Sequence, residues 1–296
     1  MEAIRRVVSA LIWLLLPLTA EAEPQATEPR QACPDKPLSD VLAQHKPPPL
    51  KVGQPAFDRK IFWQRIEEIS RKGEVFRFAS KRNGEDGKAK SVDKEVVLHR
   101  SVVAPERRAA VNAIIDRWEA TGGGHPKHLA LILGTAYRET CGLLSSGVGE
   151  ACGCKTTCAV DELGAAGYGR KDQCGRAFFG RGFVQITNKG TYESVGKRLG
   201  GVPLADYPDL AYEPALATIL LVDGVKNRWY AGKPLRNYLD DSLSNWVEAR
   251  ESVNPHSRNK VATGYLACRF YDALQPAYLG KAPTQDPQLC IGLKNL

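Results

Sequence analysis

PKHLALILGTAYRET, residues 126–140, has the apolar spacing of an α-helix and ends on a charged, polar turn. Its apolar side chains fall on one helix face: Leu129, Ile132, Leu133 and Ala136. Gly142 follows at the position where a helix stop is expected. The stretch therefore predicts a helix that packs one face against a core and ends near Thr140.

Glu139 lies in the last turn of this expected helix, three residues after Ala136 and seven after Ile132. It therefore shares part of the apolar face. Partial removal from water favours the neutral form of a carboxyl group, which a general acid must carry. The structural alternative is a helix-end glutamate in a salt bridge with a neighbouring arginine.

A second carboxylate follows in a glycine-containing segment. Glu150 comes eleven residues after Glu139, beyond Gly142, Gly147 and Gly149. Two carboxyl groups facing each other across a groove are the minimum equipment for glycoside hydrolysis, because one protonates the leaving oxygen and the other activates water. Glu150 could instead be an ordinary solvated loop residue.

Outward from this stretch, most of the sequence has helical periodicity. Apolar stripes at 61–69 and 111–118 and patterns at 214–229 and 258–273 predict further helices. FVQIT, residues 183–187, is the one segment with a strand pattern, and the charged, glycine-containing residues 80–94 predict an exposed loop. The expected fold is mainly α, with a small β element.

The N-terminus has the three parts of a secretory signal peptide. Arg5 and Arg6 precede the apolar run VVSALIWLLLPL (7–18), and AEA (20–22) offers a cleavage position. A membrane anchor is the alternative, but the run is about a dozen residues, whereas a spanning helix needs roughly 20. We expect residues 1–22 to be a signal peptide, no membrane span, and a secreted or periplasmic protein.

Three further regions follow the expected signal. Residues 23–56 are Pro-rich and polar, which indicates a linker or surface tail that contains Cys33. Residues 57–275 are expected to form one catalytic domain, and residues 276–296 a C-terminal extension.

Eight cysteines lie beyond the signal, at positions 33, 141, 152, 154, 158, 174, 268 and 290. An even number in an exported chain indicates disulfides, although the spacing from Cys152 to Cys174 could also offer four thiolates to zinc. Five cysteines fall between Cys141 and Cys174, so full pairing requires at least one bond to a cysteine outside that cluster.

The net charge is +8 at neutral pH. A basic exported protein can meet an anionic cell wall, although solubility alone also accounts for such a charge. The lysines and arginines are scattered and no nucleic-acid-binding motif accompanies them, so we expect no nucleic-acid partner.

Several segments together resemble glycoside hydrolase family 19, which contains chitinases and phage-type lysozymes. LILGTAYRET (131–140) resembles the family's ATAxHET helix, and FGRGFVQIT (179–187) with Tyr192 resembles its GRGxxQLT…NY segment. YPDLAYEP (207–214), WYAGKPLRNY (229–238) and ARESVN (249–254) resemble NPDLALDP, GWFTGKKLSDY and ARRxINGxxR of the bacterial branch. These segments follow one another in the family's order.

The resemblance implies an inverting glycosidase with Glu139 as general acid and Glu150, within about one residue of the family's position, as general base. Gln185 and Thr187 match positions that hold substrate and orient the attacking water. Positions in the cleft or supporting it match three more residues: Tyr192, Asn254 and Arg258. The implied substrate is a β-1,4-linked N-acetylglucosamine polymer, either peptidoglycan or chitin.

The same resemblance implies a lysozyme-like α+β fold with two lobes around a substrate groove. It implies a monomer that needs no cofactor and no metal. The alternative from another class is a catalytically inactive cell-wall glycan-binding protein that uses the same groove.

The chain also departs from the family pattern. Arg138 replaces the usual histidine before the acid and places a cation beside it. Thr191 stands where the family has asparagine, and VNP (253–255) replaces Ile-Asn-Gly. An insertion at residues 151–174 carries four cysteines and is expected to reshape one wall of the groove.

Overall fold

The computed structural model describes residues 32–50, 55–83, 89–147, 170–230, 233–255 and 259–279. From Cys33 onward they belong to one compact unit. The expected signal peptide, Glu150, Arg258 and most of the C-terminal extension lie outside the described residues.

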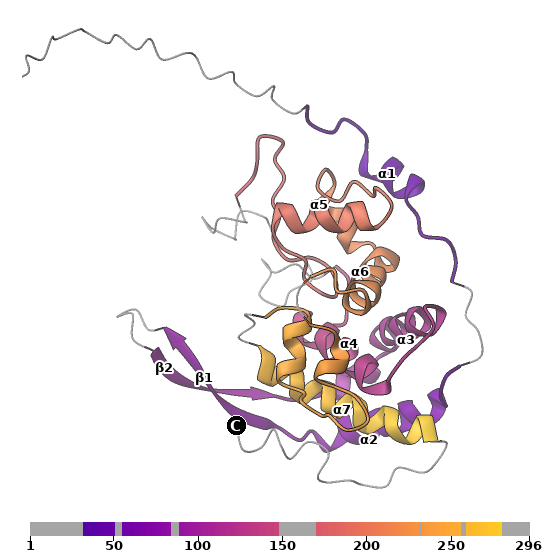
Figure 1. Ribbon diagram of the computed structural model, residues 1–296, viewed down its shortest axis with the longest axis vertical. Helices are drawn as coiled ribbons and strands as arrows, with labels where there is room; N and C mark the ends of the chain where they lie inside the picture. Colours follow the sequence, from indigo (N-terminus) through magenta and orange to yellow (C-terminus); the bar gives the residue numbers. More distant parts are fainter. Residues whose placement is uncertain are drawn as a thin grey trace, which may run out of the picture. The chain divides into compact units, whose positions relative to one another are not determined.

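The described part of the chain is mainly helical, as the sequence predicts (Figure 1). Its α-helices are α1 (Leu38–Gln44), α2 (Arg59–Lys72), α3 (Pro105–Ala120), α4 (Pro126–Glu139), α5 (Lys189–Arg198), α6 (Pro214–Lys226) and α7 (Lys260–Leu279). Short 3-10 helices are η1 (Arg100–Val103), η5 (Pro208–Tyr212), η6 (Leu235–Asn237) and η7 (Glu248–Ser252). Strands β1 (Phe76–Asn83) and β2 (Ala89–Val96) form an antiparallel pair.

Helix α4 is the central element of the core. It packs against α3, α6, η7 and most extensively α7. Gly134 permits the close approach to α7, since a Cβ there would lie 2.6 Å from the backbone nitrogen of Ala267. The sequence predicts burial of one face of this helix, whereas α4 is buried on almost every side between Leu129 and Tyr137.

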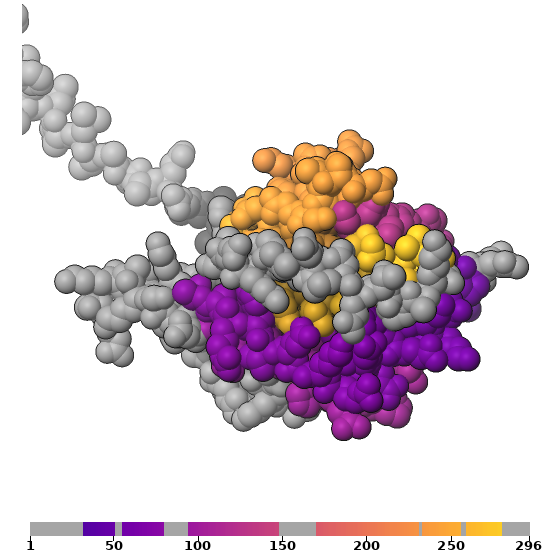
Figure 2. Space-filling model, turned by 90° about the horizontal axis from the view of Figure 1, so that it is seen from below, coloured from indigo at the N-terminus to yellow at the C-terminus, as the bar shows by residue number. Residues whose placement is uncertain are grey.

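Helix α7 links the two ends of the folded unit. It packs against α2 and η7, and in Figure 2 it is seen in yellow between the purple N-terminal elements and the orange segment. Gly264 allows this contact with the segment before η7, because a Cβ there would lie 2.9 Å from the carbonyl oxygen of Trp246.

The predicted β element is at a different place from the one expected. Residues 183–187 form turns, with only an isolated bridge between Arg181 and Ile186, so the strand prediction is wrong. Residues 80–94, predicted as an exposed loop, belong largely to the β1–β2 hairpin. Phe76 and Phe78 alternate along β1 and point to the same face, where both are buried and anchor the hairpin. The Phe76 ring also stacks on Tyr265, with 4.7 Å between the ring centroids.

The helix predictions hold in position, and their ends follow local capping. Asp58 accepts hydrogen bonds from the backbone nitrogens of Lys60 and Ile61 and so caps α2. Pro105 occupies the first turn of α3, as expected. Two helices were not anticipated, α1 and α5, because both are short and polar.

Part of the segment predicted as linker belongs to the folded unit. Val41 of α1 is only 2% exposed and contributes to the core. Cys33 forms a disulfide with Cys174. The compact unit thus starts well before the expected boundary at Phe57.

The cysteines within the described residues are all oxidised. Besides the Cys33–Cys174 bond, Cys141 and Cys268 are each disulfide-bonded. For these four positions disulfides, and not zinc thiolates, are confirmed. The Cys174 bond also confirms that the cysteine cluster pairs outside itself. Among the described helices, none is long and apolar enough to cross a membrane.

Candidate functional site

Glu139 is the last residue of α4, and the chain turns sharply immediately after it. The hydroxyl of Thr140 donates to the carbonyl oxygen of Ala136 at 2.6 Å and accepts from the backbone nitrogen of Leu144 at 2.9 Å. Cys141 and Gly142 both have positive φ, at 52° and 77°. This turn ends the helix, so the Glu139 carboxylate projects from the last turn of a rigid, buried element.

A buried arginine holds the Glu139 carboxylate. Nη2 of Arg250, in η7, donates to Oε1 of Glu139 at 2.6 Å. The Arg250 side chain is 3% exposed and that of Glu139 is 15% exposed. Within the described part of the chain, Oε2 of Glu139 has no hydrogen-bond partner. One oxygen is thus fixed, while the other remains available.

The Arg250 guanidinium depends heavily on this one acidic partner. Its Nε and Nη1 atoms are buried and have no hydrogen-bond partner among the described residues. A buried cation is tolerated only when it is paired, so Glu139 is required by its surroundings as well as held by them.

The neighbouring Arg138 does not pair with Glu139. Its Nη2 donates instead to Oδ1 of Asn259, directly before α7, at 3.0 Å. Arg138 is the sequence neighbour of the expected acid, but Arg250 is the arginine that pairs with its carboxylate. Nothing local in the sequence indicates this, because 111 positions separate Glu139 from Arg250.

Asn254 lies beside this pair. Its backbone nitrogen donates to the carbonyl oxygen of Arg250 at 3.0 Å, and the residue is exposed. Lys260, at the start of α7, bonds Glu248 at 2.8 Å and so ties α7 to η7. The structure therefore groups Asn254 with Glu139 through Arg250.

Gln185 and Thr187 form a second group in a tight turn. Gln185 has a positive φ of 56°, and its Nε2 donates to the carbonyl oxygen of Gly182 at 2.7 Å. The Thr187 hydroxyl donates to the carbonyl oxygen of Gln185 at 2.9 Å. Both side chains are half-buried, whereas the adjacent Ile186 is buried. The polar side chains thus face away from the core in a fixed turn.

Tyr192 supports this turn from beneath. It is completely buried, its hydroxyl donates to the carbonyl oxygen of Phe179 at 2.8 Å, and it accepts from Nη1 of Arg181 at 3.1 Å. Burial raises the pKa of Tyr192 well above its ordinary value, which keeps the hydroxyl neutral. Tyr192 therefore contacts this turn from the protein interior, through Phe179 and Arg181.

Arg181, a residue that the sequence did not single out, organises the same turn. Its Nε donates to Asp209 at 2.8 Å, and its guanidinium lies 3.7 Å from the centre of the Phe179 ring. It is 3% exposed, so its charge serves the interior of the protein. The FGRG motif that contains it was the available signal.

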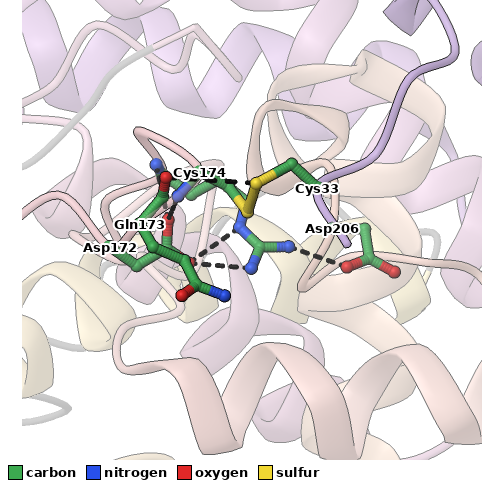
Figure 3. The surroundings of a disulfide bond; sticks show 6 residues. Cys33, Asp172, Gln173, Cys174 and Asp206 are labelled. Carbon is green, nitrogen blue, oxygen red and sulfur yellow. Dashed lines mark hydrogen bonds and ion pairs between the residues drawn. A yellow bond between two sulfur atoms is a disulfide. The ribbon is translucent and has the colours of Figure 1, made fainter. Parts of the chain in front are cut away.

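The Cys33–Cys174 disulfide fixes the C-terminal end of the cysteine-rich insertion (Figure 3). Asp172 accepts from the backbone nitrogen of Cys174 at 2.9 Å and from Nε of Arg176 at 2.8 Å. Arg176 also donates to Asp206 at 2.7 Å. Burial opposes ionisation of Asp172, but the bonds from Arg176 prevail and lower its pKa.

No group of three or more metal-ligating side chains is placed to hold an ion within the described residues. No protein-family model matches the chain, and comparisons with curated proteins and with solved structures found none that is similar.

Proposed function

We propose that this protein is an exported glycoside hydrolase that cleaves a β-1,4-linked N-acetylglucosamine polymer, peptidoglycan or chitin. The observation that carries the proposal is the state of Glu139. It ends a rigid, buried helix, with one oxygen held by Arg250 and the other without a partner in the described part of the chain.

A general acid must present its proton at a fixed position, and rigid elements provide such positions better than loops do. In the proposed reaction Glu139 carries a proton on Oε2 while Oε1 accepts from Arg250, and it transfers that proton to the leaving glycosidic oxygen. Glu150, which lies outside the described residues, is proposed to activate water on the opposite face of the sugar. An inverting reaction requires the two carboxyl groups to be roughly 6.5–9.5 Å apart.

Gln185, Thr187 and Asn254 are proposed to hold the sugar chain, since each offers a polar group that is at least partly accessible. Tyr192 and Arg181 would act only by fixing the Gln185 turn. Disulfide-bonded cysteines support export, because such bonds persist in oxidising compartments.

One observation favours a second function, that of a catalytically inactive glycan-binding protein. A helix-end glutamate paired with a buried arginine is also what a purely structural salt bridge looks like. In that case the same polar residues would bind glycan without cleaving it.

The test is to incubate the mature protein with peptidoglycan and with chitin oligomers and to identify new chain ends by mass spectrometry. Cleavage of either polymer that is lost in Glu139→Gln supports the hydrolase. Binding without cleavage would establish the glycan-binding alternative. Neither binding nor cleavage would rule out both functions.

A further inference from the structure

Arg138 and Glu139 are consecutive residues that contact two separate elements. Successive side chains on a helix point about 100° apart, so neighbours in the last turn of α4 can reach different partners. Glu139 pairs with Arg250 in η7, and Arg138 bonds Asn259 directly before α7. Both contacts come from the same rigid helix end.

These two partners bracket Asn254. Arg250 lies four residues before it, and its carbonyl oxygen accepts a hydrogen bond from the Asn254 backbone nitrogen. Asn259 lies five residues after it, and its own carbonyl oxygen accepts from Thr263 in the first bonded turn of α7. The bond from Arg138 to Asn259 therefore helps to fix the start of α7. Asn254 lies between this point and Arg250.

The residue directly before Asn254 is anchored as well. Val253 is only 6% exposed and belongs to the core, whereas Asn254 is exposed. Nε of Arg138 is buried and has no hydrogen-bond partner in the described part of the chain. Among the described residues, Arg138 thus makes its side-chain hydrogen bond to Asn259.

We infer that Arg138 is a positioning residue that holds Asn254 in place relative to Glu139, and so sets the affinity for the sugar chain. The inference rests on the proposed function, because it takes Asn254 as a substrate contact.

Arg138 should therefore affect KM and leave kcat nearly unchanged. Loss of the Arg138–Asn259 bond loosens Asn254 but leaves the Glu139–Arg250 pair intact. Arg138→Met, which keeps an unbranched stem but cannot donate, should raise KM for a short oligosaccharide about tenfold, with kcat changed by no more than about twofold. Asn259→Leu should also raise KM, and the effect of the double variant should be smaller than the sum of the two single effects, because the Arg138–Asn259 bond is lost in each.

Asn259→Asp keeps the acceptor and should retain nearly the wild-type KM. Arg117→Met is the matched control, since Arg117 on α3 bonds Asp223 on α6 at 2.8 Å and is also part-buried. It should lower stability without raising KM. Oligosaccharide binding, measured by calorimetry in a Glu139→Gln background, should weaken about tenfold with Arg138→Met.

If the wild-type protein is active and the KM of Arg138→Met is the same as that of the wild type, the inference is wrong and the proposed function still stands. Additive effects in the double variant would also overturn it. If Arg138→Met does not fold, the contrast between Asn259→Leu and Asn259→Asp decides. A wild-type protein that neither binds nor cleaves the oligosaccharide would overturn the proposed function, and the inference with it.

Discussion

Oε1 of Glu139 accepts a 2.6 Å hydrogen bond from Nη2 of Arg250, and this bond joins the end of α4 to η7. The two residues differ in burial, because the arginine side chain is 3% exposed and the glutamate side chain 15%. The glutamate can therefore recover some hydration if its partner is lost, and the arginine cannot.

Glu139→Leu should destabilise the protein more than Arg250→Met does. Leaving a buried charge without its partner costs about 3–5 kcal/mol, and Glu139→Leu leaves the more deeply buried charge. Arg250→Met leaves a carboxylate that water can still reach in part, so its cost should be smaller. Urea denaturation of the two variants at neutral pH measures the difference in the free energy of unfolding.

The double variant Glu139→Leu/Arg250→Met is the control, because it removes both charges together. It should be more stable than Glu139→Leu alone. Equal losses in the two single variants, or a double variant whose loss is the sum of both, would show that the pair does not behave as a buried ion pair.

Glu139→Gln should abolish most hydrolysis. The amide keeps the shape and one hydrogen-bond acceptor for Arg250 but has no transferable proton. General acid catalysis contributes about 10²–10⁴-fold to rate, and a sugar leaving group should place the loss at the upper end. The measurement is kcat on a short oligomer, corrected for the fraction folded, because the weakened Arg250 contact should also lower stability.

Glu193→Gln is the appropriate control for this experiment. Its side chain is 48% exposed, and its contact with Lys189 is long, at 3.8 Å. Glu119 is unsuitable, although its position on a polar-rich helix indicates a surface residue. Its side chain is 4% exposed and bonds both Arg59 and the backbone nitrogen of Ala56. Normal hydrolysis by Glu139→Gln would refute the proposed mechanism.

The helices were predictable because their apolar residues repeat along the chain. The β1–β2 hairpin was missed because charged residues between Lys81 and Lys94 hide its pairing, and only Phe76 and Phe78 show the alternation. FVQIT has the composition of a strand, but Gly182 packs so closely that a Cβ there would lie 2.6 Å from the carbonyl oxygen of Ala211. A tight turn replaces the strand.

The site was predictable to the extent that it is local in sequence. Glu139 at the end of α4 follows from helical periodicity, and its position is as expected. Its pairing with Arg250 and the release of Arg138 to Asn259 depend on how α4, η7 and α7 meet. No pattern in one sequence specifies which of two arginines reaches a given carboxylate.

Loss of the Cys33–Cys174 bond should lower stability more than turnover. Cross-links that close long loops typically contribute about 2–4 kcal/mol by restricting the unfolded chain, and this loop spans 141 positions. Cys33→Ser and Cys174→Ser should show similar losses in urea denaturation. Turnover of a short oligomer should remain nearly unchanged, also when residues 23–50 are removed.

A collapse of turnover in the truncated protein with the fold intact would mean that the N-terminal segment completes the site. Val41 provides the comparison, because its buried side chain anchors α1 without any disulfide. Val41→Ala should lower stability modestly and leave the Cys33–Cys174 bond in place.

Stability should fall as the pH drops below about 6.5, in part because of His128. Burial lowers the pKa of His128, which outweighs the opposing effect of its 2.7 Å hydrogen bond to the carbonyl oxygen of Leu239. The folded pKa therefore lies below the unfolded value of about 6.5, so the unfolded chain binds more protons in that window. The contribution of His128 to stability is complete above the unfolded pKa and is lost progressively as the pH falls below it.

His128→Gln can still donate to Leu239 but does not titrate, so its free energy of unfolding should decline less than that of the wild type between pH 7 and 5. From pH 7 to 9 the two proteins should respond alike, and identical curves below pH 6.5 would show that His128 does not contribute.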